Sequence, residues 1–337
     1  MVRLKAQVDT RGDRPHDVPD VVCVGESMLT VSHRSGRLRP GDGCALHAAG
    51  AESNAAMYLA ALGHRAAWAS RVGTDPLGEA LLADIAAAGV DTSMVERVDG
   101  LPTGVMFKER RHGATSVHYY RAGSAAASMG AAFARRLEMA GNVLLLSGIT
   151  PALSPSCSEL IEELLGLATE RGVRIVFDVN YRPRLWGDGA AETLRDIARR
   201  ADVVLVGADE ARALWAEDRP DHLHDLLVRG EGVLVVKNGG IDATAVGPAG
   251  RFCVPARRVP VVDAVGAGDA FAAGWISGTL RGLPIDQRLQ LAHLVARSAL
   301  AAVSDVGTLP DASEICQELG IPMDTWITSS TRISTCP

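Results

Sequence analysis

The 337-residue chain has few aromatic residues and no long apolar run. Phe, Trp and Tyr make up only 4% of it, and the abundant alanine, glycine and aliphatic residues suit helices packed closely on a sheet. No apolar stretch approaches the roughly 20 residues of a membrane-spanning helix. The first 19 residues are charged and lack the apolar segment of a signal peptide. We therefore expect a cytoplasmic α/β protein without a membrane partner.

Cysteine pairs and an excess of basic residues are also missing. The six cysteines form no C-x-x-C motif, which argues against a metal cluster or a disulfide framework and favours a reducing compartment. The formal net charge is -6, whereas binding to a nucleic-acid backbone needs a basic surface. We expect no nucleic-acid partner.

Three common phosphate-binding motifs are absent. The chain has no G-x-x-x-x-G-K-[ST] sequence and neither H-R-D nor D-F-G, which excludes a P-loop nucleoside triphosphatase and a protein kinase. G-x-G-x-x-G fails because its third position is Phe271. A phosphate site in this chain must therefore be built differently.

The stretch from Val261 to Trp275 supplies a different anion site. The small residues Gly266-Ala267-Gly268 form a turn before a helical pattern that begins at Asp269, and the first amides of a helix attract anions. A carboxylate in a first turn is an ordinary helix-stabilising choice. Beside an anion site it also fits a general base that faces a hydroxyl group during phosphoryl transfer.

The nine residues from Asp263 to Phe271 carry a family resemblance. They read D-A-V-G-A-G-D-A-F, which resembles the D-T-x-G-A-G-D-x-F signature of the ribokinase-like (PfkB) carbohydrate kinases, with Ala264 where threonine is usual. The resemblance implies that Asp269 is the general base and that Gly266, Ala267 and Gly268 form the anion hole. It also implies ATP and Mg²⁺ as cofactors, and a monovalent cation such as K⁺ near Asp263 and Ala264.

Alternating apolar runs and helical patterns predict the architecture. Buried strands such as Asp20 to Val24 and Val143 to Ser147 alternate with helices, which is typical of a parallel sheet. The alternation of strands and helices is interrupted twice. Within about 28–47 and 95–121 we expect strands of a small separate sheet, a lid over the ligand site. With the resemblance, this predicts a ribokinase-like Rossmann-type αβα sandwich with a small β-sheet lid. We expect a disordered leader over 1–19, a kinase domain over 20–312, and a tail over 313–337 with at most one short helix.

The sequence Gly50-Ala51-Glu52-Ser53-Asn54 precedes an alanine-rich helix. On residue types alone it is a loop and helix cap. It resembles the family signature G-G-x-x-x-N-x-A, with Ala49 in place of the leading glycine. The resemblance implies that Asn54 hydrogen-bonds sugar hydroxyls and that Gly50 and Ala51 let the sugar lie against the backbone.

Two further stretches have both an ordinary and a functional interpretation. Lys237-Asn238-Gly239-Gly240 is typical of a hairpin turn, and it also resembles the family's K-x-G-x-x-G nucleotide loop, with Ala243 at the last glycine. Lys237, Gly239 and Gly240 would then bind the nucleotide together with Gly266 and Gly268. Glu210 is an ordinary first-turn acid that matches the family's N-x-x-E motif, in which the glutamate organises magnesium through water, but Gly207 replaces the asparagine.

Two arginines near tyrosines suggest an acidic substrate. Arg121 follows Tyr119 and Tyr120, and Arg182 follows Tyr181; guanidinium groups pair with carboxylates through two hydrogen bonds. The segment Y-Y-R-x-G-S-A-A resembles 2-keto-3-deoxygluconate kinases, which implies that Tyr119, Arg121 and Arg182 hold the sugar acid. Some of these kinases have a lid tyrosine where this chain has Met106. The segment D-x-N-x-R-x-x-L-W is shared with fructokinases and 5-dehydro-2-deoxygluconokinases and does not discriminate.

The hypothesis is an ATP-dependent kinase that converts 2-dehydro-3-deoxy-D-gluconate to its 6-phosphate. ATP would lie between the Lys237 loop and the Gly266 turn, with adenine against the predicted helix Ile285 to Ser304. A fructokinase or nucleoside kinase remains open, as does a non-catalytic sugar or nucleotide sensor on the same fold. By resemblance, the lid could pair two chains into a homodimer.

Overall fold

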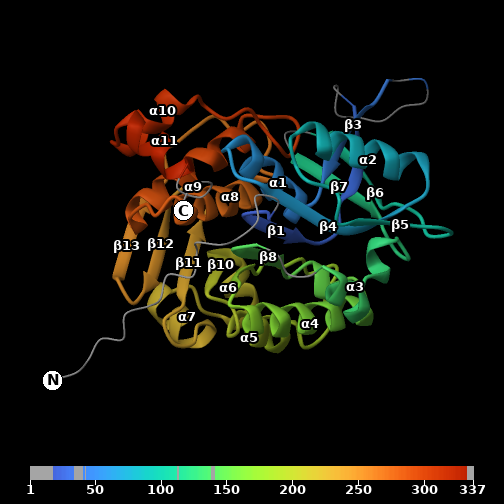
Figure 1. Cartoon of the computed structure of the whole chain (residues 1–337), viewed down its shortest axis with the longest axis horizontal. Helices are drawn as coiled ribbons and strands as arrows, with labels where there is room; N and C mark the ends of the chain where they lie inside the picture. The colour runs from blue at the N-terminus through green and yellow to red at the C-terminus, as the bar shows by residue number, and fades with distance from the viewer. Residues whose placement is uncertain (1–17, 34–40, 42, 112–113, 138–140, 332–337) are drawn as a thin grey trace.

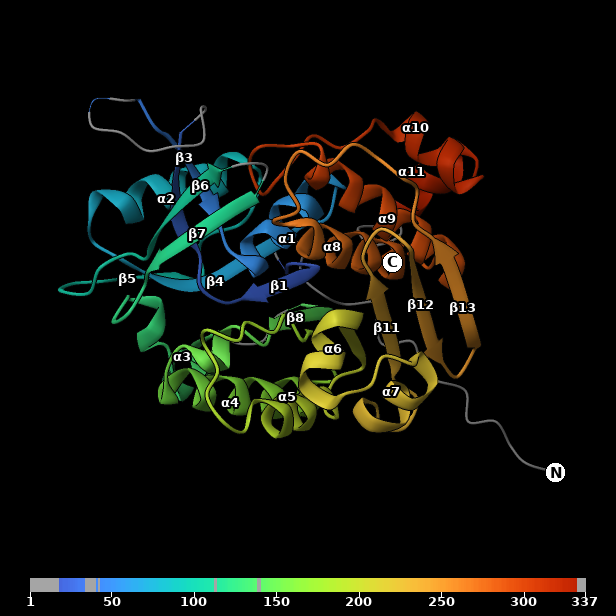
Figure 2. The same ribbon diagram turned by 180° about the vertical axis from the view of Figure 1, so that it is seen from behind.

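The computed structural model describes residues 18–33, 41, 43–111, 114–137 and 141–331. Most of the expected leader, residues 1–17, lies outside this range, and so does the C-terminal end from residue 332. Within the described residues a large sheet is covered by helices on both faces, and a second, smaller sheet lies at one end (Figures 1 and 2). This is the predicted αβα sandwich with a small β-sheet.

The large sheet is mainly parallel. Central strands such as β8 and β10 are buried runs of mainly valine and leucine, as expected where helices cover both faces. Only the last two strands run antiparallel to their neighbours. The strand order is β13 (Gly250–Pro255), β12 (Asp242–Gly247), β11 (Val233–Asn238), β10 (Val203–Gly207), β9 (Arg174–Asp178), β8 (Val143–Ser147), β1 (Val21–Val24), β4 (Ala66–Gly73) and β5 (Val95–Val98).

The connectivity of this sheet reverses beside β1. From β1 the chain passes to β4 and β5 on one side, and it then returns to the other side through β8 and continues outward. Open α/β sheets bind their ligands outside the carboxyl ends of the strands at such a reversal. The candidate site is therefore expected where β1, β8 and β9 end.

The helices divide into two layers with separate cores. In the layer that carries the Gly266 turn, a Cβ atom at Gly274 would lie 2.6 Å from the Cα atom of Ala292, so α8 and α9 pack closely. This layer contains α1 (Ala51–Ala61), α2 (Pro76–Ala87), α8 (Ala267–Leu280), α9 (Ile285–Leu300), α10 (Ala312–Leu319) and α11 (Met323–Thr331). The other contains α3 (Ala131–Arg136), α4 (Pro155–Arg171), α5 (Ala190–Ala198), α6 (Ala208–Trp215) and α7 (Pro220–Leu227).

The small sheet is the predicted lid. Its strand order is β3 (Ala45–Ala49), β2 (Met28–Ser32), β6 (Val105–Arg111) and β7 (Ala114–Tyr120). The register pairs Met106 with Tyr119, so these two side chains share a face with Lys108, two residues along. Met106 packs there in a small buried cluster with Met28 and Ala49. This face of the lid is directed towards the body of the molecule.

Three expectations were wrong. Residues 95–98 form β5 at the edge of the large sheet and do not belong to the lid, because they pair with β4. The C-terminal segment contains two helices, α10 and α11, where at most one was expected; Ile315, Leu319 and Trp326 are buried in the core. The short helices α3 and α7 were not predicted, because they have only 6 and 8 residues and their apolar periodicity is brief.

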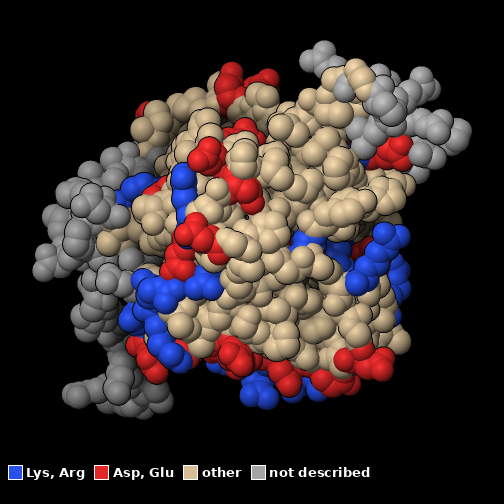
Figure 3. Space-filling view, turned by 90° about the vertical axis from the view of Figure 1, so that its right-hand side faces the viewer, with Lys and Arg blue, Asp and Glu red and all other residues tan. Residues whose placement is uncertain are grey.

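The outer surface is of mixed charge. On the face shown in Figure 3, lysine and arginine lie among acidic and uncharged residues, with no continuous basic surface over its described part. Within the described residues, no helix combines the length and the apolar character needed to cross a membrane.

Candidate active site

A hollow of about 200 Å³, which includes space open to solvent, lies at the expected place in the sheet. Ser147 ends β8, and Asp178 and Asn180 come from the end of β9, since parallel strands bring their carboxyl ends to one edge. Glu52 from α1 and Asp269 from α8 line the same hollow. The predicted base and part of the predicted sugar segment are therefore brought together, although they are far apart in the sequence.

Asp269 is partly buried in the first turn of α8 and is held by two asparagines. Asn54 Nδ2 donates to its Oδ2 atom at 2.9 Å, and Asn180 Nδ2 donates to its Oδ1 atom at 3.4 Å. Burial raises its pKa to about 7; the Asn54 hydrogen bond opposes this shift and the charge of Asp178 adds to it. A carboxyl group that changes charge near neutral pH and faces a hollow has the properties of a general base.

The turn before Asp269 requires glycine. Gly266 has a φ of 84°, in the left-handed region, and a Cβ atom there would lie 2.3 Å from the carbonyl oxygen of Asp305. The helix begins directly after it, with Ala270 N donating to Gly266 O at 2.9 Å. First-turn amides of a helix have no intrahelical acceptor, so those of Gly268 and Asp269 are suited to an anion. The amide of Ala267 makes a long hydrogen bond, 3.4 Å, to the carbonyl of Ala264, and an anion would compete with that contact.

Unsatisfied acceptors surround the hollow. Among the described residues, Glu52 Oε2, Asn54 Oδ1 and Asn180 Oδ1 are buried without a hydrogen-bond partner. Such atoms are costly unless a ligand donates to them. Three acceptors beside a carboxylate fit a ligand with several hydroxyl groups.

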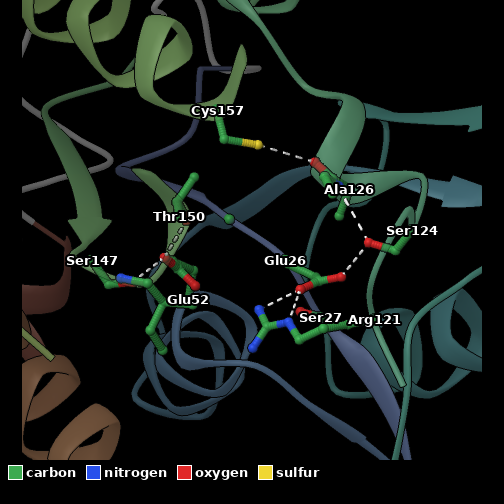
Figure 4. Close-up of polar contacts among 12 residues, drawn as sticks. Glu26, Ser27, Glu52, Arg121, Ser124, Ala126, Ser147, Thr150 and Cys157 are labelled. Carbon is green, nitrogen blue, oxygen red and sulfur yellow. Dashed lines mark hydrogen bonds and ion pairs between the residues drawn. The ribbon is translucent and has the colours of Figure 1, made fainter. Parts of the chain in front are cut away.

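Glu52 is a site residue to which the sequence interpretation assigned no role. Its Oε1 atom accepts hydrogen bonds from Ser147 at 2.7 Å and from Thr150 at 3.1 Å (Figure 4). Burial raises its pKa to about 7, although these two hydroxyls oppose the shift. A glutamate at the start of an alanine-rich helix is usually exposed to solvent. Only the burial of Glu52 against β8 therefore identifies it as a site residue.

The structure pairs Arg121 with a carboxylate of the protein itself. Arg121 Nε donates to Glu26 Oε2 at 2.6 Å, its Nη2 atom contacts the same oxygen, and Ser124 Oγ donates to Glu26 Oε1 at 2.6 Å (Figure 4). Both charged side chains are largely buried. The guanidinium of Arg121 also lies 5.7 Å from the ring centre of Tyr119, which is partly exposed.

Arg182 is more open to solvent than Arg121. Its Nη1 atom donates to the carbonyl of Tyr181 at 3.1 Å and lies 3.6 Å from Glu210 Oε1. Neither Arg121 nor Arg182 is among the residues that line the hollow. Their predicted contact with a substrate carboxylate therefore stays a prediction.

Lys237 carries positive charge next to the Gly266 turn. Its Nζ atom donates to both carboxylate oxygens of Asp178, at 2.8 and 2.9 Å, and would lie 3.7 Å from a Cβ atom at Gly268. Burial disfavours its charge, but Asp178 and Glu210 outweigh burial and raise its pKa. Beyond Lys237 the chain makes the predicted hairpin between β11 and β12, with Gly239 at a φ of 53°.

Glu210 has the ordinary helix-capping role. Its Oε2 atom accepts the amide of Gly207 at 2.8 Å, at the start of α6. Burial raises its pKa, opposed by Lys237. Within the described residues no group of three or more His, Cys, Asp or Glu side chains could hold a metal ion. A magnesium ion bound here would need phosphate oxygens and water as its main ligands.

One cluster near the anion hole was missed. Lys108 of the lid lies 2.9 Å from Asp263, the first residue of the D-A-V-G-A-G-D signature, and 2.6 Å from Asp305. The sequence pattern gave Lys108 no role, since on an isolated lid strand it is an ordinary solvated lysine.

Comparisons with known proteins show the family of the chain. Residues 18–312 match the family model described as pfkB family carbohydrate kinase. The chain is 35% identical over 308 residues to a 2-dehydro-3-deoxygluconokinase of Bacillus subtilis (strain 168), covering 89% of this chain and 95% of the relative.

Two solved structures share the fold. A PfkB protein of Polaromonas sp. JS666 is 34% identical with a TM-score of 0.78, covering 89% of this chain and 99% of that one. An uncharacterised sugar kinase of Pyrococcus horikoshii, solved with ATP, is 22% identical with a TM-score of 0.75 over the same shares of the two chains. The matched motifs, the fold and the family model lead to one conclusion: this chain belongs to the pfkB family of carbohydrate kinases.

Proposed function

We propose that the protein transfers the γ-phosphoryl group of ATP to a hydroxyl group of a sugar acid. The acceptor that we favour is 2-dehydro-3-deoxy-D-gluconate, which would become its 6-phosphate. The observation that carries the proposal is the partly buried carboxylate of Asp269, held by two asparagines at a hollow with unsatisfied acceptors. The relative in Bacillus subtilis, named for this substrate, supports the choice of sugar acid.

The residues present fit a nucleotide and a divalent ion. The anion hole at α8 and the charged amine of Lys237 suit phosphate groups, and the Lys237 to Gly240 turn borders the same edge of the sheet. When bound, ATP supplies the phosphoryl group and Mg²⁺ neutralises its charge. Glu210 would orient water on that ion, a role compatible with its hydrogen bond to Gly207.

The chain's own side chains would handle the acceptor. Asn54, Asn180 and Glu52 would hold sugar hydroxyls, and the backbone at Gly50 and Ala51 would lie against the sugar. Asp269 would take the proton of the attacking hydroxyl as the hydroxyl oxygen bonds to the γ-phosphorus of ATP and the bond from that phosphorus to ADP breaks, so that ADP leaves. The amides of Ala267, Gly268 and Asp269 would stabilise the charge on the transferred group. Closure of the lid would exclude water, a competing acceptor.

A coupled ADP-release screen tests this function. Purified protein with ATP and Mg²⁺ should release ADP with 2-dehydro-3-deoxy-D-gluconate and much less with fructose or a nucleoside. Preference for fructose or a nucleoside would support the neutral-substrate alternatives instead. ATP or sugar binding without a phosphorylated product would indicate a sensor, against which the raised pKa of Asp269 argues.

We predict that Arg121 confers preference for acidic acceptors. Arg121→Gln should raise KM for the sugar acid by roughly 10-fold or more, as expected for loss of a charge-assisted hydrogen bond. The KM for a poor neutral sugar should change little. Steady-state kinetics with both acceptors measure this difference.

The structural pair with Glu26 needs a matched control. Arg121→Gln alone leaves the buried carboxylate of Glu26 without its cation, which destabilises the fold. The double variant Glu26→Gln/Arg121→Gln removes both charges and should recover thermal stability. If it also recovers the KM for the sugar acid, Arg121 has only a structural role.

We also propose a homodimer formed through the lid. Leu46 on β3 and Tyr120 on β7 are 51% and 67% exposed and share the outer face of that sheet with Phe107. Light scattering at micromolar concentration should give twice the 35.4 kDa chain mass. A single-chain mass would rule the dimer out under those conditions.

A further inference from the structure

Lys108 is a lid lysine whose ammonium lies inside the protein. It belongs to β6, and its register turns it towards the body of the molecule. Its Nζ atom lies 2.6 Å from Asp305 Oδ1 and 2.9 Å from Asp263 Oδ2, and the three side chains are only 5 to 6% exposed. Buried lysines are rare unless paired, so this contact is a specific feature of the fold.

The two aspartates flank the turn that makes the anion hole. Asp263 precedes Gly266 by three residues, and its Oδ1 atom accepts the amide of Val265 at 3.2 Å. Asp305 lies on the other side, with its carbonyl oxygen where a Cβ atom of Gly266 would clash. The loop of Asp305 is itself held from α1, because Gly307 N donates to the hydroxyl of Tyr58 at 2.7 Å. Lys108 thus connects the two chain segments, at Asp263 and at Asp305, that lie on either side of the Gly266 turn.

The charges make the lysine necessary. Two buried carboxylates beside an anion site would repel each other and the incoming phosphate group unless a cation stays between them. Burial disfavours the charge of Lys108, but Asp305 and Asp263 outweigh burial and raise the pKa of its amine. The lysine therefore remains charged.

We propose that the ammonium of Lys108 serves as a built-in monovalent cation for the anion hole, so that catalysis needs no added K⁺ or NH₄⁺. By holding Asp263 and Asp305 together it fixes the backbone from Asp263 to Gly266, which orients the first amides of α8. Lys108 is therefore a positioning residue. Because it is part of the lid, the same contact anchors the lid to the anion hole. This inference rests on the proposed kinase function.

The first measurement is the cation dependence of the unmodified enzyme. At a fixed ionic strength of about 0.1 M, kcat should be the same within about 2-fold in tetramethylammonium, sodium and potassium chlorides. A larger difference would mean that the added cation changes the activation barrier of the reaction. A strict requirement for K⁺ would overturn the proposal.

The second measurement is chemical rescue of Lys108→Met. In tetramethylammonium chloride its kcat should fall by roughly 100-fold, comparable to the loss of one oriented oxyanion donor. Potassium or ammonium ions should restore at least part of it, because they can enter between the two carboxylates. A folded variant that neither ion rescues would show that the lysine is only a structural tie.

Control variants separate this role from general salt effects. Arg71→Met removes a cation paired with Glu96 on the far strands β4 and β5, and K⁺ should not change its activity. Lys108→Arg keeps the charge and should keep independence from K⁺. If Lys108→Met does not fold in tetramethylammonium, recovery of its folding and activity in K⁺ still supports the proposal. The cation dependence of kcat in the unmodified enzyme remains a separate test.

Thermal unfolding gives a readout that does not depend on the reaction. Potassium should raise the midpoint of Lys108→Met above its value in tetramethylammonium, and it should not change the midpoint of the unmodified protein or of Arg71→Met. If no sugar acid is phosphorylated, the kinase proposal fails, but the shift still reports whether a cation occupies the place of the lysine. No shift in Lys108→Met would overturn the inference.

Discussion

Asp269→Asn should lower kcat by roughly 100-fold or more while KM for ATP and for the sugar acid changes little. The amide is nearly the same size as the carboxylate and can still accept the hydrogen bond of Asn54, but it cannot take a proton from the acceptor hydroxyl. Steady-state kinetics of the purified variant provide the measurement. An equally active variant would refute the role of Asp269 as base.

Thermal unfolding controls for damage to the fold. Asp269 has a pKa of about 7 in the folded chain against an ordinary value of 3.8, so its protonated form favours folding and this contribution is lost as pH rises from about 4 to about 7. At pH 8 the neutral amide avoids the cost of a charge that is partly removed from water. The variant should therefore unfold at the same temperature as the unmodified protein or above it, and a lower midpoint would mean that its lost activity has a structural cause.

The pH profile gives a second readout of the same carboxylate. Since the base must be ionised, kcat/KM should fall about 10-fold per pH unit below an apparent pKa near 7. Glu52 has a similarly raised pKa, so the residual profile of Asp269→Asn separates the two. Loss of the acidic limb in that variant assigns it to Asp269, whereas an unchanged limb assigns it to another group.

Gly266→Ala should lower kcat/KM by roughly 100-fold or more, comparable to the loss of an oriented donor from an oxyanion hole. A Cβ atom there would lie 2.3 Å from the carbonyl of Asp305, and the φ of 84° is itself unfavourable for alanine. The left-handed conformation alone costs about 1–2 kcal/mol. The turn must shift, which would misdirect the first amides of α8 and lower the thermal midpoint.

Gly268→Ala is the control for fold stability, two residues further along the same turn of chain; its activity tests the proposed anion hole as well, because Gly268 is part of it. A Cβ atom at Gly268 meets only the Lys237 amine, at 3.7 Å, and the residue is within α8. Alanine in a helix is more stable than glycine by roughly 0.5–1 kcal/mol, so the midpoint should hold or rise. If both variants keep full activity, phosphate groups do not approach this turn.

The regular architecture followed from local patterns. Strands such as Val143 to Ser147 were predicted to the residue, because a buried parallel strand is a continuous apolar run. The C-terminal helices were underestimated, since α10 is short and its apolar residues are buried by packing on α9 and α11. The edge strand β5 was assigned to the wrong sheet, because pairing with β4 depends on where the chain returns after α2.

What the sequence determined by itself is the glycine turn with its carboxylate, the proposed anion hole. Gly266, the first amides of α8 and Asp269 are neighbours along the chain, and backbone conformation depends mainly on nearby residues. Tertiary structure alone decided which distant groups complete the site: Asn54 contacts Asp269 across 215 residues, and Lys108 contacts Asp305 across 197. Such contacts depend on packing and strand register, since a shift of one residue in β6 would turn Lys108 to the opposite face of the lid.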